Sequence, residues 1–270
     1  MTYTFIGDIH SAADDLAVLL QAPTLQDSRL IFLGDYIDGS GSRAGTTEPA
    51  LLDTRAVLDM VMNRVDHYQD VALLGNHDDF WLQTARGDDL SFQTWHLNGG
   101  AKSWRQLGIH SSNPLVVAKA LNQAPLVKYT KFFARLPLTW STDHLLAVHA
   151  GIDWDYPLNR QVRDDLMWIR DPYYFDTDRS WHRNSTGKVI VTGHTPVQTM
   201  PHANYGCVKM QADTQDTPRY LIDAGSRSGA ADGGIFALTL AETGAVIAKS
   251  WVINRKLVCF LIRNGKLISY

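Results

Sequence analysis

Apolar and polar residues alternate along the first third of the chain in a way that predicts strands followed by helices. Short apolar runs rich in β-forming residues predict strands at 2–6, 29–33 and 71–74. Apolar side chains at helical spacing predict helices at 14–21, 49–65 and 79–85. A Gly/Ser/Thr-rich loop is expected at 39–47. Three β-loop-α repeats of this kind indicate a layered α/β fold.

The middle of the chain, from about residue 88 to residue 137, is expected to be mostly helical and less regular. Asn113-Pro114 is typical of a helix start, because Asn caps the first turn and Pro suits the first helical position. Most aromatic residues of this region are expected in the core, including Trp81, Phe92, Trp95 and Trp104. A strand at 144–148 is predicted to follow.

The last third is predicted to be rich in strands with short connections. The expected strands are 188–192, 219–222, 234–239, 245–252, 256–262 and 266–269. Asn264-Gly265 predicts a type I′ hairpin turn, since both positions of that turn need a positive φ. No linker, low-complexity tract or repeat interrupts the pattern. We therefore expect one domain, residues 1–270, with two packed sheets flanked by helices.

Composition and charge narrow the class of protein. The chain has 270 residues, 45% of them hydrophobic, so it can bury a large core, and its net charge of −3 favours neither a nucleic-acid nor a membrane partner. No apolar run approaches the roughly 20 residues that span a bilayer, and the N-terminus is typical of a strand rather than of a signal peptide. Cys207 and Cys259 lack CxxC spacing. These features favour a cytoplasmic protein with reduced thiols, although sequence alone leaves a disulfide open.

Five short motifs carry side chains that bind metals or phosphate. They are Gly7-Asp8-Ile9-His10, Gly34-Asp35-Tyr36-Ile37-Asp38, Gly75-Asn76-His77-Asp78, His149-Ala150-Gly151 and Gly193-His194-Thr195-Pro196. Four of the five directly follow an apolar β-type run, which is where open α/β sheets place their active sites. Oxygen and imidazole ligands suit Mn, Fe, Zn or Mg, and there are enough of them for two cations.

In this order the motifs resemble those of the calcineurin-like metallophosphoesterases, and within them the bacterial branch of the phosphoprotein phosphatases. The resemblance extends over nearly the whole chain and includes Asn98-Gly99-Gly100, residues 166–170 and residues 222–225. Symmetrical diadenosine tetraphosphatases are a related group. The resemblance implies a four-layer α-β-β-α fold with two mixed sheets and a site for two divalent ions, manganese first, with Fe, Zn, Ni or Mg as alternatives.

The same resemblance implies a role for each motif residue. Asp8 and His10 would hold one metal, Asp35 would bridge both, and Asn76, His149 and His194 would hold the second. A carboxylate has two oxygens and can bridge cations about 3.5–4 Å apart, which makes a shared water acidic enough to attack phosphorus as hydroxide.

His77 would donate a proton to the leaving-group oxygen, and Asp38 would orient His77 and favour its charged form. Asp78 is expected to cap the helix that follows it, and Asp223 to be structural rather than a ligand. Trp168 is a candidate for the pocket wall.

The chain departs from the family after Asp38, where Gly39-Ser40 replaces Arg-Gly. Position 39 therefore offers no guanidinium that could bind phosphate. Arg170 and Arg43 are the alternative candidates, and Asn76 is expected to contact phosphate as well.

The function expected from these residues is hydrolysis of phosphate monoesters, with phosphoserine or phosphothreonine in proteins as the substrate. Asp38 favours this over a tetraphosphatase, since that group usually has a non-acidic residue at this position. Two alternatives remain open: a phosphatase of small phosphorylated metabolites, diadenosine tetraphosphate among them, and a binding scaffold without activity.

Overall fold

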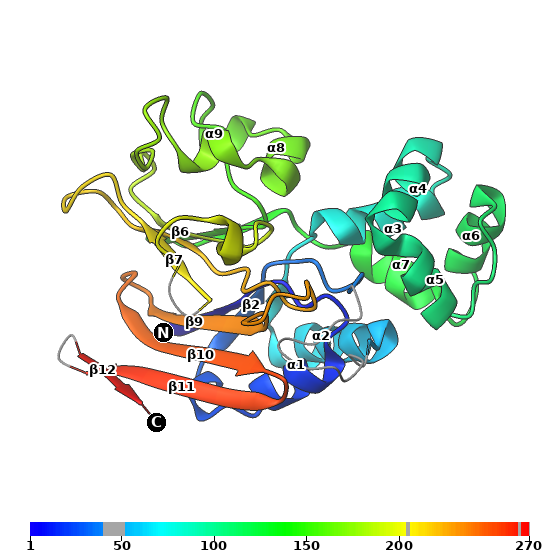
Figure 1. The fold of residues 1–270 in the computed structure, drawn as a ribbon, viewed down its shortest axis with the longest axis horizontal. Coiled ribbons are helices and arrows are strands. Elements are labelled where there is room, and N and C mark those ends of the chain that lie inside the picture. Colours follow the sequence, from blue (N-terminus) through cyan, green and yellow to red (C-terminus); the bar gives the residue numbers. More distant parts are fainter. Residues whose placement is uncertain (40–51, 204–205, 264–265, 270) are drawn as a thin grey trace.

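The computed structural model describes residues 1–39, 52–203, 206–263 and 266–269 (Figure 1). Most of the predicted loop at 39–47, including Arg43, lies outside the described residues, and so does the predicted Asn264-Gly265 turn. Within the described ranges, no helix is long and apolar enough to cross a membrane.

The first sheet has seven strands and is mixed in direction. In spatial order these are β12 (Lys266–Ser269), β11 (Lys256–Arg263), β10 (Val246–Ile253), β9 (Ile235–Ala241), β1 (Thr2–Ile6), β2 (Arg29–Phe32) and β3 (Val71–Ala72). Strands β1, β2 and β3 are parallel, with Tyr3 opposite Arg29 and Ile31 opposite Val71. Strand β9 pairs antiparallel with β1 and begins the meander that ends the chain.

The second sheet has five shorter strands. Their order is β4 (Thr139–Ser141), β5 (Leu145–Val148), β6 (Val189–Thr192), β8 (Arg219–Leu221) and β7 (Val208–Met210). Strands β5, β6 and β8 are parallel, whereas β4 and β7 pair antiparallel at the two edges. Every strand predicted from the sequence is present, and β4 and β7, the antiparallel edge strands of this sheet, were not predicted.

Helices cover the outer faces of both sheets and form a group at one side (Figure 1). They are α1 (Ala13–Leu19), α2 (Thr54–Tyr68), α3 (Asn76–Ala85), α4 (Asp89–Trp95), α5 (Ala101–Gln106), α6 (Pro114–Leu121), α7 (Val127–Phe133), α8 (Arg163–Trp168) and α9 (Asp171–Tyr174). Short 3-10 turns lie at Pro23–Leu25, Leu158–Arg160 and Val197–Thr199, and a π turn at His96–Gly100 joins α4 to α5.

Side-chain caps mark the starts of α2 and α3. Helix α2 begins at Thr54, and the Asp53 carboxylate caps its first turn by accepting the Ala56 N–H at 2.9 Å. Pro49, the predicted start of this helix, lies outside the described residues. Helix α3 begins at Asn76 rather than at 79. Asn76, a proposed metal ligand, is thus the first residue of this helix.

Three separate apolar cores show the layering. The first lies between the sheets, where Phe5 and Leu33 of one sheet meet Ala147 and Val191 of the other. The second packs α1 and α2, with the group α3–α7, against the outer face of the first sheet. The third packs α8 and α9 against the second sheet. The predicted four-layer α-β-β-α architecture with two mixed sheets is confirmed.

Candidate functional site

All five motifs lie just beyond the carboxyl ends of parallel strands. Asp8, Asp35 and Asn76 follow β1, β2 and β3, while His149 and His194 follow β5 and β6. The strands of each set run in one direction, so their ends meet at one edge of each sheet. Because the two sheets pack face to face, these edges lie against each other and the site forms where they meet.

Asp8, His10 and Asp35 form the first group of potential metal ligands. The His10 Nε2 atom lies 4.0 Å from Asp8 Oδ2 and 3.9 Å from Asp35 Oδ2. These separations are too long for hydrogen bonds but suit atoms that point at one cation from different sides. The Nδ1 atom of His10 is fixed at 2.8 Å from the carbonyl oxygen of Ile37, which leaves Nε2 facing the group.

Asp35, His149 and His194 form the second group, and all three are buried. The His149 Nε2 atom lies 3.5 Å from Asp35 Oδ1 and 2.9 Å from Asn76 Oδ1, and His194 Nδ1 lies 2.8 Å from the same amide oxygen. The Nδ1 atom of His149 is held at 2.8 Å from the carbonyl oxygen of Leu33. The amide oxygen of Asn76 therefore completes a cluster of one carboxylate, one amide and two imidazoles.

Asp35 belongs to both groups, and its two oxygens face different ones. Oδ2 points toward His10 and Oδ1 toward His149. A carboxylate shared in this way can bridge two cations. The structure therefore brings together the six residues predicted as metal ligands. The two groups share Asp35, the residue predicted to bridge the two metals.

The charges around the site also fit bound cations. Burial, together with the facing carboxylates of Asp223 and Asp35, raises the pKa of Asp8 well above its usual range. Burial would do the same for Asp35, but the surrounding histidines, His149 first, lower its pKa below the usual value. Two divalent cations would offset the cost of these buried carboxylates. The donor set thus fits the two ions that the sequence predicts.

The backbone at the site adopts conformations that side chains rarely favour. His10, Asp35, Asp38 and His194 all have positive φ angles, between 49° and 70°. Such strain persists only where the surrounding structure fixes it, and it gathers at functional sites. The backbone at Gly75 also lies very close to the Asp35 side chain, since a Cβ on Gly75 would lie 2.2 Å from Asp35 Oδ1.

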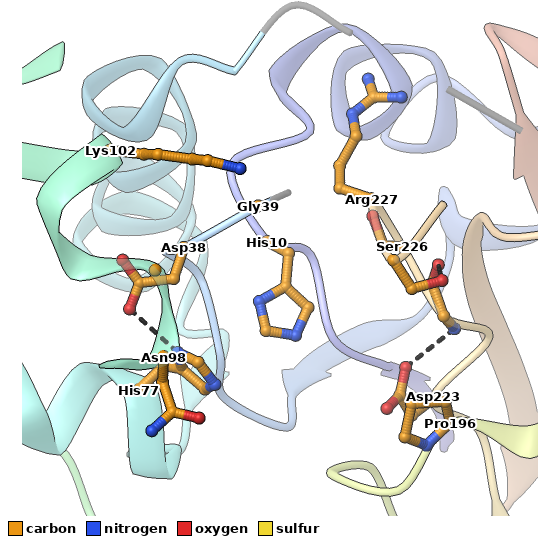
Figure 2. Close-up of a pocket in the computed structure, with 13 residues that line it drawn as sticks. His10, Asp38, Gly39, His77, Asn98, Lys102, Pro196, Asp223, Ser226 and Arg227 are labelled. Carbon is orange, nitrogen blue, oxygen red and sulfur yellow. Dashed lines mark hydrogen bonds and ion pairs between the residues drawn. The ribbon is translucent and has the colours of Figure 1, made fainter. Parts of the chain in front are cut away.

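His77 and Asp38 form the predicted pair beside this cluster. Their Nδ1 and Oδ2 atoms are 2.9 Å apart, and the His77 side chain is 18% exposed while that of Asp38 is buried (Figure 2). Burial works against a charged His77, but the nearby carboxylates of Asp35 and Asp38 outweigh it and raise the pKa of His77 to about 9. The raised pKa favours the protonated form of His77, which is the form that a proton donor needs.

Comparison with known proteins decides the family. The model of the calcineurin-like phosphoesterase family matches residues 1–222. The chain belongs to the calcineurin-like phosphoesterase family. No curated protein sequence matched it.

Three solved structures of low sequence identity are similar to this chain, and the first of them supports the fold. A candidate diadenosine tetraphosphatase is 18% identical, with a TM-score of 0.57 and 94% of each chain covered. A metallophosphoesterase from Sphaerobacter thermophilus is 16% identical, with a TM-score of 0.46 and 90% of this chain and 85% of that one covered. A serine/threonine phosphatase from Saccharomyces cerevisiae is 13% identical, with a TM-score of 0.44 and coverage of 88% and 72%.

Family and ligand clusters together make this protein a metal-dependent phosphoesterase, a hydrolase of phosphate esters whose family uses two metals. Mixed nitrogen and oxygen ligands of this kind suit several first-row cations.

The sequence did not reveal which residues hold Asp38 in the phosphoesterase site. The indole N–H of Trp95 donates to Asp38 Oδ2 at 2.6 Å, and the Ser103 hydroxyl donates to Oδ1. Both residues flank the π turn, in which Gly99 has a φ of 100°. A Cβ on Gly100 would lie 2.7 Å from the Trp95 ring, so glycine is needed for Trp95 to pack there. The Asn98-Gly99-Gly100 motif was the one available signal.

Asp78 does more than the predicted capping. Its carboxylate accepts the Gly75 N–H at 3.1 Å, as a cap does, and also the N–H groups of Asp35 and Tyr36 at 2.8 and 3.0 Å. Through these bonds Asp78 ties the loop after β2 to the start of α3. Asp223 accepts the Gly225 N–H at 2.9 Å, which suits its predicted structural role.

The three predicted phosphate-binding residues have different positions. Asn76 lies within the metal cluster. Arg170 is exposed and donates to the Thr195 hydroxyl at 3.0 Å, next to His194. Arg43 lies outside the described residues, so its role stays a prediction.

Two hollows open beside the cluster. A pocket of about 270 Å³ lies over His10 and His77 and is shown in Figure 2. A broader groove of about 650 Å³ begins at Asn76 and runs past Phe80, Leu90 and Trp168. Trp168, 39% exposed, forms part of this wall as predicted, and its ring lies 5.8 Å from that of His194. Cys207 and Cys259 are buried free thiols, as expected.

Proposed function

We propose that this phosphoesterase is a serine/threonine phosphoprotein phosphatase that acts with two divalent cations, manganese first. The observation that supports it most is the contact between His77 and Asp38 beside two ligand groups that share Asp35. When bound, the cations would supply a reactive water and neutralise the charge that grows on the phosphoryl group.

The residues of the chain divide the remaining work. Asp38 accepts from His77 Nδ1, so Nε2 is the nitrogen left to give a proton to the leaving-group oxygen. Trp95 donates to the same Asp38 oxygen that contacts His77, and Ser103 donates to the other, so both carboxylate oxygens are held in place. A serine or threonine alkoxide is a poor leaving group, and a proton donor with a raised pKa suits it.

The shape of the surface supports a large substrate. The groove that begins at Asn76 is open and lined by both apolar and polar side chains, including Leu90 at 73% exposed. A peptide on either side of a phosphorylated residue can lie along such a groove. Phosphorylated proteins are thus the proposed partners, in preference to small phosphorylated metabolites.

A substrate panel tests the proposal. Wild-type protein with added manganese is compared on phosphoserine and phosphothreonine peptides, on p-nitrophenyl phosphate and on diadenosine tetraphosphate. We expect kcat/KM to be highest on the phosphopeptides. Turnover of the dinucleotide alone would refute the protein-phosphatase proposal and favour the tetraphosphatase.

The amount of metal bound per chain distinguishes an active enzyme from a binding scaffold without activity. Protein purified without chelator is analysed for bound metals, and Asp35→Asn serves as the matched variant. Well under one metal per chain, with no turnover of any substrate after manganese is added, would favour a scaffold.

A further inference from the structure

The position after Asp38 leaves no room for a side chain in this structure. A Cβ on Gly39 would lie 2.5 Å from the carbonyl oxygen of His10 and 2.5 Å from the Leu52 side chain. Contacts that short do not occur, so an arginine at this position would require the backbone to move. A cation that binds phosphate on this side of the site must therefore come from another element.

The pocket over His10 has such a cation on its wall. Lys102, an exposed residue of α5, lines this pocket together with Gly39, His10 and His77. In Figure 2 its side chain extends across the opening of the pocket, and its ammonium group lies on the side of His10 and Gly39. An ammonium group on a flexible stem suits a phosphate oxygen, because it acts as a point charge with three donors.

The start of α5 is anchored to the catalytic pair. Ser103, the residue after Lys102, donates its hydroxyl to Asp38 Oδ1, and Asp38 in turn contacts His77. The backbone of Lys102 is thus next to a residue that contacts Asp38, the partner of the proposed proton donor His77. Its side chain is offered from a fixed point rather than from a free loop.

Among the described residues, Arg227 is the arginine that lines this pocket, and it is placed less well for this task. The guanidinium of Arg227 is bound to Asp14 and lies 3.3 Å from Asp15, and only 3% of its side chain is exposed. Figure 2 shows it turned away from His77. Two carboxylates thus compensate its charge and hold it in place.

We propose that Lys102 binds the scissile phosphoryl group of the substrate. It would contact a non-bridging oxygen from the α5 side, in the place left empty by Gly39. This inference rests on the proposed function, since it assumes that a phosphate monoester is hydrolysed at the two ligand groups. It adds a substrate-binding residue that lies outside all five motifs.

The test compares Lys102→Met with Lys102→Arg, and uses Lys119→Met as the matched control. Lys119 is also an exposed helical lysine, but it belongs to α6 and lines neither the pocket nor the groove. Three quantities are measured for manganese-loaded protein: KM and kcat on p-nitrophenyl phosphate, the inhibition constant of inorganic phosphate, and the dependence of KM on ionic strength. A fourth, the shift in melting temperature caused by inorganic phosphate, requires no turnover.

Lys102→Met should raise KM and the phosphate inhibition constant by about tenfold, the scale of one lost hydrogen bond to a charged group at a partly exposed site. The bound metals should stay the same. Lys102→Arg should restore most of the affinity, and Lys119→Met should match the wild type. The increase of KM with salt should become weaker in Lys102→Met, because a screened charge has been removed.

If KM and the phosphate inhibition constant of Lys102→Met stayed within about twofold of the wild type, the inference would be overturned, because the loss of one hydrogen bond to a charged group has a larger effect. Equal losses in Lys102→Met and Lys102→Arg would overturn it too, because they would show a steric role. If Lys102→Met did not fold, Lys102→Gln would be judged by the same criteria. Failure of the proposed function is distinct: the wild type itself would then be inactive on phosphate monoesters.

Discussion

Asp38→Asn tests how the site keeps a proton on His77. The change keeps the size of the side chain but removes the charge that lies 2.9 Å from His77 Nδ1. Burial lowers the pKa of His77, and Asp35 and Asp38 together raise it to about 9. Loss of one close carboxylate should lower that pKa by about 1–2 pH units.

The expected loss of activity depends on pH in a defined way. With a pKa of about 9, His77 is about 90% protonated at pH 8; a pKa of 7–8 would leave about 9–50%. The ratio of wild-type to mutant kcat should therefore grow by about two- to tenfold between pH 6 and pH 8. Any loss from poorer orientation of His77 would be the same at both values.

The assay is kcat on a phosphoserine peptide from pH 5.5 to 9.5, with metals saturating. Asp66→Asn is the control, because Asp66 is an exposed carboxylate paired with Arg135 at 2.6 Å and far along α2. It should leave the profile unchanged. If the ratio for Asp38→Asn were constant across this range, the proposed effect of Asp38 on the pKa of His77 would be refuted.

Two further predictions concern the support of the site, and a third concerns a buried thiol of the core. Gly75→Ala should lose most activity and bound metal, since its Cβ would lie 2.2 Å from Asp35 Oδ1; elemental analysis and kcat measure this, and full metal content would contradict it. Trp95→Phe removes the indole donor to Asp38 and should lower kcat by about tenfold while metal content is kept, so an unchanged kcat would argue against this support. Cys207 is buried and burial raises the pKa of its thiol to about 11, so it should resist thiol reagents at pH 8 until denaturant is added, and prompt labelling of the folded protein would contradict its burial.

The strands and the metal ligands were predictable because their signals are local. An apolar run followed by Gly-Asp or Gly-His marks both a buried strand and the residue at its end. The two sheets and the positions of Asp8, Asp35 and His194 therefore followed from the sequence pattern together with the family resemblance.

The contacts that hold Asp38 could not be predicted in the same way. Trp95 and Ser103 reach Asp38 from 57 and 65 residues away in sequence. Trp95 was expected only to be a core residue and Ser103 was not singled out, because nothing next to either in sequence indicates a buried carboxylate. Such partners are determined by packing between distant segments, and sequence periodicity carries no information on that.

The start of α3 was misplaced for a related reason. The Asp78 carboxylate caps α3 and also binds the N–H groups of Asp35 and Tyr36, so a single side chain determines the start of the helix and the shape of the loop after β2. The local pattern showed only that a cap was present near residue 78. The tertiary bonds moved the start of the helix back to Asn76.

The central claim is tested most directly by a crystal structure of the manganese-loaded protein with anomalous diffraction data. The account predicts two manganese peaks about 3.5–4 Å apart, with one oxygen of Asp35 or each of its two oxygens between them. Asp8 and His10 should then bind one ion, and Asn76, His149 and His194 the other. A single peak, or two peaks without a shared Asp35, would contradict it.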